Sequence, residues 1–195
     1  SILCKKTMYR SLFLLAVCCG ISSGISVAQT SGKRVLVFSK TAGYRHASIP
    51  VGQKLIIKFG KENGFAVDTT ENANAFTDEN LKKYNEVVWL STTGDVLNNE
   101  QQNAFERYIQ AGGGYVGIHA ATDTEYDWTW YNKLAGAQFA SHPKNNVQTA
   151  EAYVVNRNHP SMEGFPDRWT VKDEFYDFKN FNKDVTVLIK MDEKT

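Results

Sequence analysis

Hydrophobic residues between positions 33 and 120 form four compact runs whose length and β-branched composition are typical of buried strands. The runs cover residues 33–39, 65–70, 86–91 and 115–120. Between them, apolar positions recur at helical spacing in residues 50–63, 77–84 and 98–111. Strands that alternate with helices in this way predict a parallel sheet with right-handed crossovers and helices on both faces.

Signals for helix ends support these boundaries. Pro50 suits the first turn of the first helix, and Gly64 suits its end. Thr77 is a typical N-cap for the second helix. Asn98 begins the third helix with Gln101 three residues later, which is the spacing of a capping box.

The second half of the chain has a different pattern. After Asn132, residues 146–155, 169–178 and 184–189 read as extended segments without helices between them. We expect these segments to lie at an edge of the main sheet, so the predicted fold is an α/β three-layer sandwich with a mostly parallel sheet. The chain ends soon after the last segment without a closing helix, and we therefore expect a domain that is incomplete at its C-terminus.

Residues 1–28 have the pattern of an export signal. Three basic residues lead it, an apolar run follows at residues 12–21, and small residues precede an expected cleavage after Ala28. The basic residues are Lys5, Lys6 and Arg10. Because the run is shorter than the about 20 apolar residues of a transmembrane helix, we expect no membrane span. Residues 29–195 then form the mature domain, which we place in the periplasm or outside the cell.

The cysteines limit the chemistry of this mature domain. All three, Cys4, Cys18 and Cys19, lie in the expected signal. The mature domain therefore has neither a disulfide nor a cysteine nucleophile. Val17 fits a lipoprotein signal at Cys18 poorly, so we expect no lipid anchor.

The charge balance gives no reason to expect a nucleic-acid partner. The chain has 22 basic and 21 acidic residues, and 42% of its residues are hydrophobic, which is ordinary for a globular domain. Without the three basic residues of the expected signal, 19 basic residues face 21 acidic ones, a net charge of −2. A nucleic-acid-binding domain would instead show a clustered basic face. The sequence leaves homo-oligomerisation open.

The expected topology brings polar residues together at one edge of the sheet. Ligands of open parallel sheets bind outside the carboxyl ends of the strands, and loops 39–48, 91–95 and 119–127 leave such ends. The candidate catalytic residues are His119, His46, Asp123 and Glu125. The candidate substrate-binding residues, which include neighbouring aromatic rings and a carboxylate of the second half, are Tyr44, Arg45, Thr93, Trp128, Trp130 and Glu174.

Each of the candidate catalytic residues also has a purely structural interpretation. His119 could be a buried residue that caps the following turn, and His46 could lie on the surface of a polar loop. Asp123 could cap a turn or a helix. Glu125 could favour the first turn of a helix through the helix dipole.

The aromatic residues near the fourth strand also have two interpretations. Trp128 and Trp130, together with Tyr44, could form a platform on which a sugar ring stacks. Alternatively, the two tryptophans could anchor a short helix to the core, which aromatic side chains do well.

A metal site is a further possibility that the residue types allow. His46 and His119 with a carboxylate such as Glu174 would suit zinc or another divalent ion with an open coordination position. No dense motif such as HExxH is present to strengthen this interpretation. His142 and His159 both precede proline, and we interpret both as structural.

Several segments together resemble the ThuA-like family, which is named for a trehalose-utilisation protein. They read SKTAGYRHASIPVG, GGGYVGIHAATDTEYDW, HPSMEGFPDRW and DEFYDF. The resemblance extends from about Lys33 to the end of the chain, and it implies a class I glutamine-amidotransferase-like, flavodoxin-like fold. In glutaminases of this fold, the turn after the equivalent strand carries a cysteine nucleophile. Here the position is His119 and the mature chain has no cysteine, which excludes glutaminase chemistry.

The resemblance also implies a role in carbohydrate metabolism. Our first hypothesis is an exported enzyme, a hydrolase or other sugar-modifying enzyme, that acts on a disaccharide, a glycoside or a keto-sugar. Its pocket would be centred on His119, with or without a divalent metal. The alternatives are a non-catalytic sugar-binding module and an interaction domain of a larger exported protein.

Overall fold

The computed structural model describes residues 32–143 and 147–194. The expected export signal and the three cysteines therefore lie outside the described residues. None of the helices within these ranges is long and apolar enough to cross a membrane.

A four-stranded parallel sheet is the centre of the fold. Its strands are β1 (Arg34–Phe38), β2 (Ala66–Thr70), β3 (Glu86–Leu90) and β4 (Gly114–Ile118), in the order β2-β1-β3-β4. All four were predicted from the hydrophobic runs, with ends that differ by one or two residues. Because all four strands are parallel, the loops after β1, β3 and β4 leave the same edge of the sheet, and the strand order reverses at β1, where folds of this kind leave a crevice.

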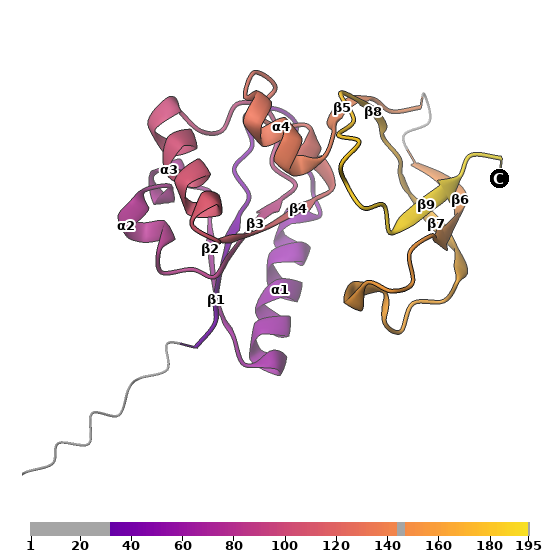
Figure 1. Cartoon of the computed structure of the whole chain (residues 1–195), viewed down its shortest axis with the longest axis horizontal. Helices are drawn as coiled ribbons and strands as arrows, with labels where there is room; N and C mark the ends of the chain where they lie inside the picture. The colour runs from indigo at the N-terminus through magenta and orange to yellow at the C-terminus, as the bar shows by residue number, and fades with distance from the viewer. Residues whose placement is uncertain (1–31, 144–146, 195) are drawn as a thin grey trace, which may run out of the picture. The chain divides into compact units, whose positions relative to one another are not determined.

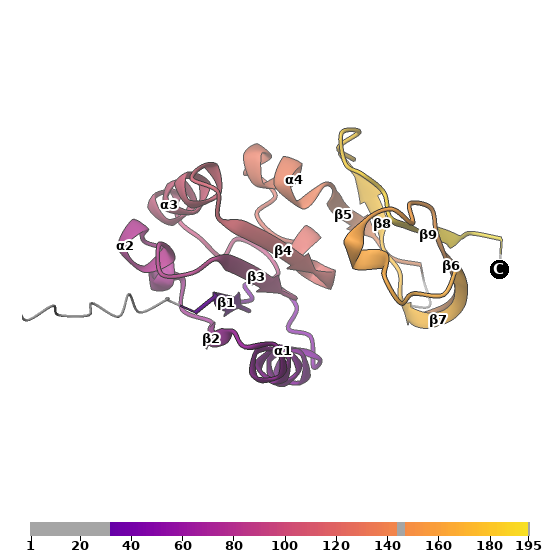
Figure 2. The same ribbon diagram turned by 60° about the horizontal axis from the view of Figure 1, so that its bottom comes forward.

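Helices cover both faces of this sheet, as Figures 1 and 2 show. The helix α1 (Ile49–Asn63) lies on one face, and α2 (Asp78–Leu81), α3 (Asn99–Gln110) and α4 (Thr129–Ala135) lie on the other. Three short 3₁₀ helices are η1 (Ala73–Ala75), η2 (His119–Thr122) and η3 (Pro160–Met162). The α/β fold prediction is therefore confirmed.

The apolar runs of the two central strands, β1 and β3, are continuous because each of these strands contributes to two cores. Val37 and Phe38 are adjacent in β1, point to opposite faces and are both fully buried. Phe38 packs with Trp89 and Phe105 beneath α3, while Val37 packs with Ile56 of α1. A strand that is buried on both faces cannot alternate apolar and polar residues.

The helix ends have the chemistry that the sequence predicts. The Asn98 side chain accepts a hydrogen bond from the Gln101 amide, and the Gln101 side chain accepts one from the Asn98 amide. This reciprocal pair is a capping box. Gly64 ends α1 with a φ of 73°, in the left-handed region that glycine enters without strain.

The second half of the chain forms two small antiparallel sheets instead of extending the main one. One pairs β5 (Gln138–Ser141) with β8 (Asp177–Lys179), and the other has the order β7-β6-β9, with β6 (Val147–Val154), β7 (Arg168–Glu174) and β9 (Ile189–Asp192). Two expectations need correction. Residues 169–178 are not one strand, because β7 pairs with β6 only as far as Glu174 and the chain then moves to β5. Residues 184–189 begin with a turn in which the Asp184 amide donates to the Asn182 side chain, so the last strand begins at Ile189.

Candidate functional site

The loops after β1, β3 and β4 lie side by side beyond the carboxyl edge of the main sheet. Isolated parallel bridges join Thr41 to Thr93 and Gly94 to Thr124, which continue the pairing of the strands into these loops. The loop after β1 carries His46, and His119 directly follows β4. The strand order thus places both histidines at the same edge of the sheet, as predicted, and the two loops bring them together.

His119 occupies a backbone conformation that few residue types adopt. It begins η2 with a φ of 51°, in the left-handed region. This conformation turns the chain sharply away from β4 and projects the imidazole beyond the strand end, as a nucleophile elbow projects its side chain. Only a few per cent of non-glycine residues adopt this conformation, and histidine is among the types that enter it more often.

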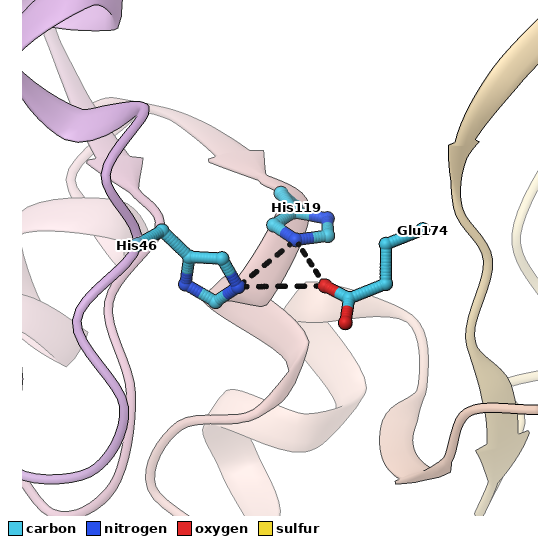
Figure 3. A group of neighbouring side chains, drawn as sticks. All are labelled: His46, His119 and Glu174. Atoms are coloured by element: carbon cyan, nitrogen blue, oxygen red, sulfur yellow. Dashed lines mark hydrogen bonds and ion pairs between the residues drawn. The ribbon is translucent and has the colours of Figure 1, made fainter. Parts of the chain in front are cut away.

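Three side chains from distant parts of the chain meet at this point, as Figure 3 shows. The Nε2 atom of His119 lies 3.1 Å from Nε2 of His46 and 3.1 Å from Oε2 of Glu174. The same Glu174 oxygen lies 3.5 Å from Nε2 of His46. Glu174 is the last residue of β7, so the small three-stranded sheet supplies the third corner of the triangle. All three side chains are at least three-quarters buried.

The electrostatic environment favours neutral His46. Burial lowers the pKa of His46, the neighbouring His119 ring lowers it further, and the Glu174 carboxylate opposes both effects. Among the described residues, its Nδ1 atom is buried without a hydrogen-bond partner. An imidazolium would need an acceptor at that nitrogen, so the geometry and the lowered pKa agree.

Tyr176 and His142 also contribute to this centre. The Tyr176 ring stacks on the His119 ring with centroids 4.7 Å apart, and its hydroxyl lies 3.1 Å from His119 Nε2. Burial, and then the carboxylates of Glu174 and Asp123, raise the pKa of Tyr176. His142 places its Nε2 atom 4.0 Å from Oε1 of Glu174.

These groups line one cavity of about 950 Å³. Two further predicted site residues, Tyr44 and Asp123, also line it. Tyr44 is 72% exposed, and its ring meets the His46 ring edge-on with centroids 4.9 Å apart. The Asp123 carboxylate accepts a hydrogen bond from Tyr126.

Three other predicted residues lie outside the cavity lining and have structural partners. Arg45 forms a two-pronged ion pair with Glu71. Thr93 is fully buried and donates a hydrogen bond to the Tyr44 carbonyl. Glu125, 1% exposed, accepts hydrogen bonds from the amides of Val96 and Leu97, and burial raises the pKa of its carboxyl.

The two predicted sugar-platform tryptophans also lie outside the cavity lining. Trp128 and Trp130 stack on each other at 5.2 Å, and each makes an edge contact with Phe105 in the core. They anchor α4 to α3 and the core, which corresponds to the structural alternative considered for them.

Sequence reasoning missed Tyr176 and misread His142. Tyr176 stands two residues after Glu174, so it would share a face with that carboxylate in an extended segment, and this spacing was a usable signal. His142 was interpreted as structural because a proline follows it. The position of the segment after β5 beside Glu174 depends on pairing between β5 and β8, which local sequence does not indicate.

Comparison with known proteins agrees with this description. The sequence profile of the ThuA family, described as trehalose utilisation, matches residues 34–195. The chain belongs to the ThuA family. No functionally curated protein is significantly similar to it.

Solved structures with the same fold include two ThuA-like proteins. The one from Bacteroides uniformis ATCC 8492 is 26% identical with a TM-score of 0.72, over 83% of this chain and 69% of that one. The one from Parabacteroides merdae ATCC 43184 is 20% identical with a TM-score of 0.67, over 82% of this chain and 68% of that one. A Thermoplasma acidophilum protein described as a GMP synthase subunit is 13% identical with a TM-score of 0.52, over 82% and 73% of the two chains. This last similarity shows the fold alone, a class I amidotransferase-like fold in which His119 follows the fourth strand.

Proposed function

We propose that this ThuA-family protein is a divalent-metal-dependent enzyme that acts on a small carbohydrate. The observation that carries the proposal is the convergence of His46 Nε2, His119 Nε2 and Glu174 Oε2 within 3.5 Å of one another. Two imidazoles and a carboxylate form a typical ligand set for a catalytic ion that keeps one open position.

The dimensions of the triangle support an ion. Zinc binds histidine nitrogen and carboxylate oxygen at about 2.0–2.2 Å. An ion about 2.05 Å from all three atoms would lie about 0.8 Å out of their plane. A regular tetrahedron places its centre about 0.7 Å from the plane of three ligands at this bond length. The three atoms therefore have the spacing of three corners of a tetrahedron, with the fourth left for substrate or water.

Hydrogen bonding alone accounts poorly for the same contacts. His119 Nε2 has three polar atoms at 3.1 Å, from His46, Glu174 and Tyr176. An imidazole nitrogen has a single in-plane lone pair or a single N–H, so it serves one of these neighbours well. A cation at the centre would satisfy the histidines and the carboxylate together.

Carbohydrate as the substrate is supported by the family and by the cavity. The family is described as trehalose utilisation. A cavity of about 950 Å³ is at the upper end of the usual range for small-molecule sites and has room for a disaccharide. The exposed Tyr44 ring offers a stacking face, and Asp123 offers a hydroxyl acceptor. An ion with an open position would polarise a sugar carbonyl or activate a water molecule.

We also propose that the protein is exported and acts in the periplasm or outside the cell. The basic lead, the apolar run and the small residues before Gln29 support this proposal. The absence of cysteine after residue 28 is compatible with it, because no exposed thiol is left to oxidise.

Metal content of the purified full-length chain, measured by elemental mass spectrometry after dialysis, tests the proposal. We expect about one divalent ion per chain in the wild type and only traces in His119→Asn, because that ligand is lost. His159→Asn is the matched control, since His159 is exposed and its side chain accepts from the Ser161 amide, which asparagine can also do. Equal metal content in all three proteins would refute the metal site.

Turnover distinguishes an enzyme from a sugar-binding module. We expect the metal-loaded wild type to convert a member of a panel of glycosides and keto-sugars, chelation to abolish the activity, and added ion to restore it. Metal-dependent sugar binding without any turnover would instead favour the binding module.

A further inference from the structure

Tyr176 would lose one of its hydrogen-bond partners in the cavity, Nε2 of His119, when an ion fills the proposed metal site. Its hydroxyl lies 3.1 Å from His119 Nε2. When that nitrogen binds an ion, its lone pair is engaged, and it can no longer accept a hydrogen bond from the phenol. The hydroxyl would then keep the Glu174 carboxylate as its neighbouring acceptor, and a ligand oxygen that enters the cavity would compete with that carboxylate for its hydrogen.

The position of the hydroxyl is fixed by packing. The Tyr176 ring stacks on the His119 ring at 4.7 Å with an interplanar angle of 28°. On its other side it meets the Phe139 ring edge-on at 4.4 Å. Both contacts hold the ring in one orientation, and Tyr176 lines the same cavity as the two histidines. A donor placed before the ligand arrives costs little entropy when the ligand binds.

We propose that the Tyr176 hydroxyl donates a hydrogen bond to the oxygen atom that occupies the open position of the ion. This inference rests on the metal site proposed above. It assigns a ligand class to the open position, an oxygen with a free lone pair such as a sugar carbonyl, an alkoxide or a carboxylate. Tyr176 thereby selects and orients the substrate oxygen that the ion polarises.

The neighbouring tyrosines do not offer the same arrangement. Tyr126 donates its hydroxyl hydrogen to Asp123. Tyr44 lies against His46 instead of His119, with a largely exposed ring. Tyr84→Phe is the control for Tyr176→Phe, because it removes a phenolic hydroxyl that donates to Asp68 and lies outside the cavity lining.

The experiment uses the full-length chain loaded with Co²⁺, whose visible spectrum reports ligand exchange. Acetohydroxamate is the oxygen-donor probe, and imidazole is the control probe because its bound nitrogen has no lone pair left to accept a hydrogen bond. In Tyr176→Phe we expect one Co²⁺ per chain as in the wild type, about tenfold weaker binding of acetohydroxamate, and unchanged binding of imidazole. Tyr84→Phe should bind both probes like the wild type.

Three outcomes would overturn the inference, and they differ from failure of the metal site. Loss of Co²⁺ from Tyr176→Phe alone would make Tyr176 a ligand of the ion. Unchanged binding of acetohydroxamate, or equal weakening of both probes, would remove the specific hydrogen bond. A wild-type chain without Co²⁺ would refute the metal site and this inference together.

A second measurement decides the matter if Tyr176→Phe does not fold. Binding of acetohydroxamate to the wild type should shift the near-ultraviolet absorbance of a tyrosine whose hydroxyl gains an acceptor, and imidazole should not. The absence of this difference would overturn the inference without any variant.

Discussion

The Nε2 atoms of His46 and His119 lie 3.1 Å apart although the residues are 73 positions apart in the sequence. His46 lies in the loop after β1, and His119 directly follows β4. With β3 between these two strands, the parallel sheet places both histidines at its carboxyl edge, and β7 adds Glu174 from outside the sheet. The proposed metal site thus depends on two separately paired sheets.

The left-handed backbone conformation of His119 should determine which substitutions at this position destabilise the fold. His119→Asn should be tolerated, because asparagine enters the left-handed region more readily than other residues with a Cβ, whereas His119→Val should cost about 1–2 kcal/mol more. Denaturant unfolding with a chelator present measures the difference and removes any contribution from metal. Equal stability of the two variants would show that the strained conformation relaxes at little cost.

Glu125 should contribute to the stability of the fold and not to the reaction. Its buried carboxylate joins Gln102 to the amides that precede α3. We expect Glu125→Ala to lower the free energy of unfolding by about 2–4 kcal/mol, because two buried amides lose their acceptor. The ion content of the folded fraction should not change. A loss of turnover with unchanged stability would instead support the catalytic role predicted from sequence.

His46 should make the metal-free protein sensitive to acid. Its pKa is lowered from about 6.5 in the folded state, first by burial and then by His119. The unfolded chain therefore binds more protons below about pH 6.5, and stability is lost as the pH falls from there through the folded pKa. With a chelator present, the wild type should lose stability more steeply below pH 6.5 than His46→Gln. Parallel pH profiles for the two proteins would contradict this prediction, and His159→Asn, which keeps His46, should follow the wild type.

Substitution of Tyr44 should change the KM for the sugar, whereas substitution of a tryptophan should not. Tyr44→Ala removes an exposed ring at the cavity and should raise the KM about three- to tenfold. Trp130→Phe keeps a core ring outside the cavity lining and should leave the KM unchanged while lowering stability. Thermal unfolding and steady-state kinetics on the sugar found by the turnover screen provide both numbers. A larger KM change for Trp130→Phe than for Tyr44→Ala would instead support the prediction that the tryptophans bind the sugar.

The sequence predicted the sheet and its helices well because their signals are local. Continuous apolar runs identified the four strands, and Asn98 with Gln101 identified the start of α3. The closeness of His46 and His119 followed from a general rule about parallel sheets. These predictions required no knowledge of long-range antiparallel pairing.

The rest of the site was beyond local signals. The positions of Tyr176 and His142 depend on the pairing of β5 with β8, whose paired residues are 36 to 41 positions apart in the sequence. No turn motif in the sequence indicates this pairing. Trp128 and Trp130 show the opposite error, because aromatic composition near a strand end does not tell an exposed platform from a core anchor. Burial decides between the two, and burial here depends on how α4 packs on α3.

Because Glu174 belongs to a separate sheet, the proposed ion would also affect the stability of the fold. An ion held by His46, His119 and Glu174 would join three segments that are far apart in the sequence. It would thereby restrict the chain much as a disulfide does, and the described part of the chain has no disulfide. Its binding energy would add to the stability of the folded state in proportion to the logarithm of ion concentration. Because the chain has no cysteine after residue 28, the ion would stabilise this part of the fold independently of the redox conditions, and it would bind only after both sheets have folded.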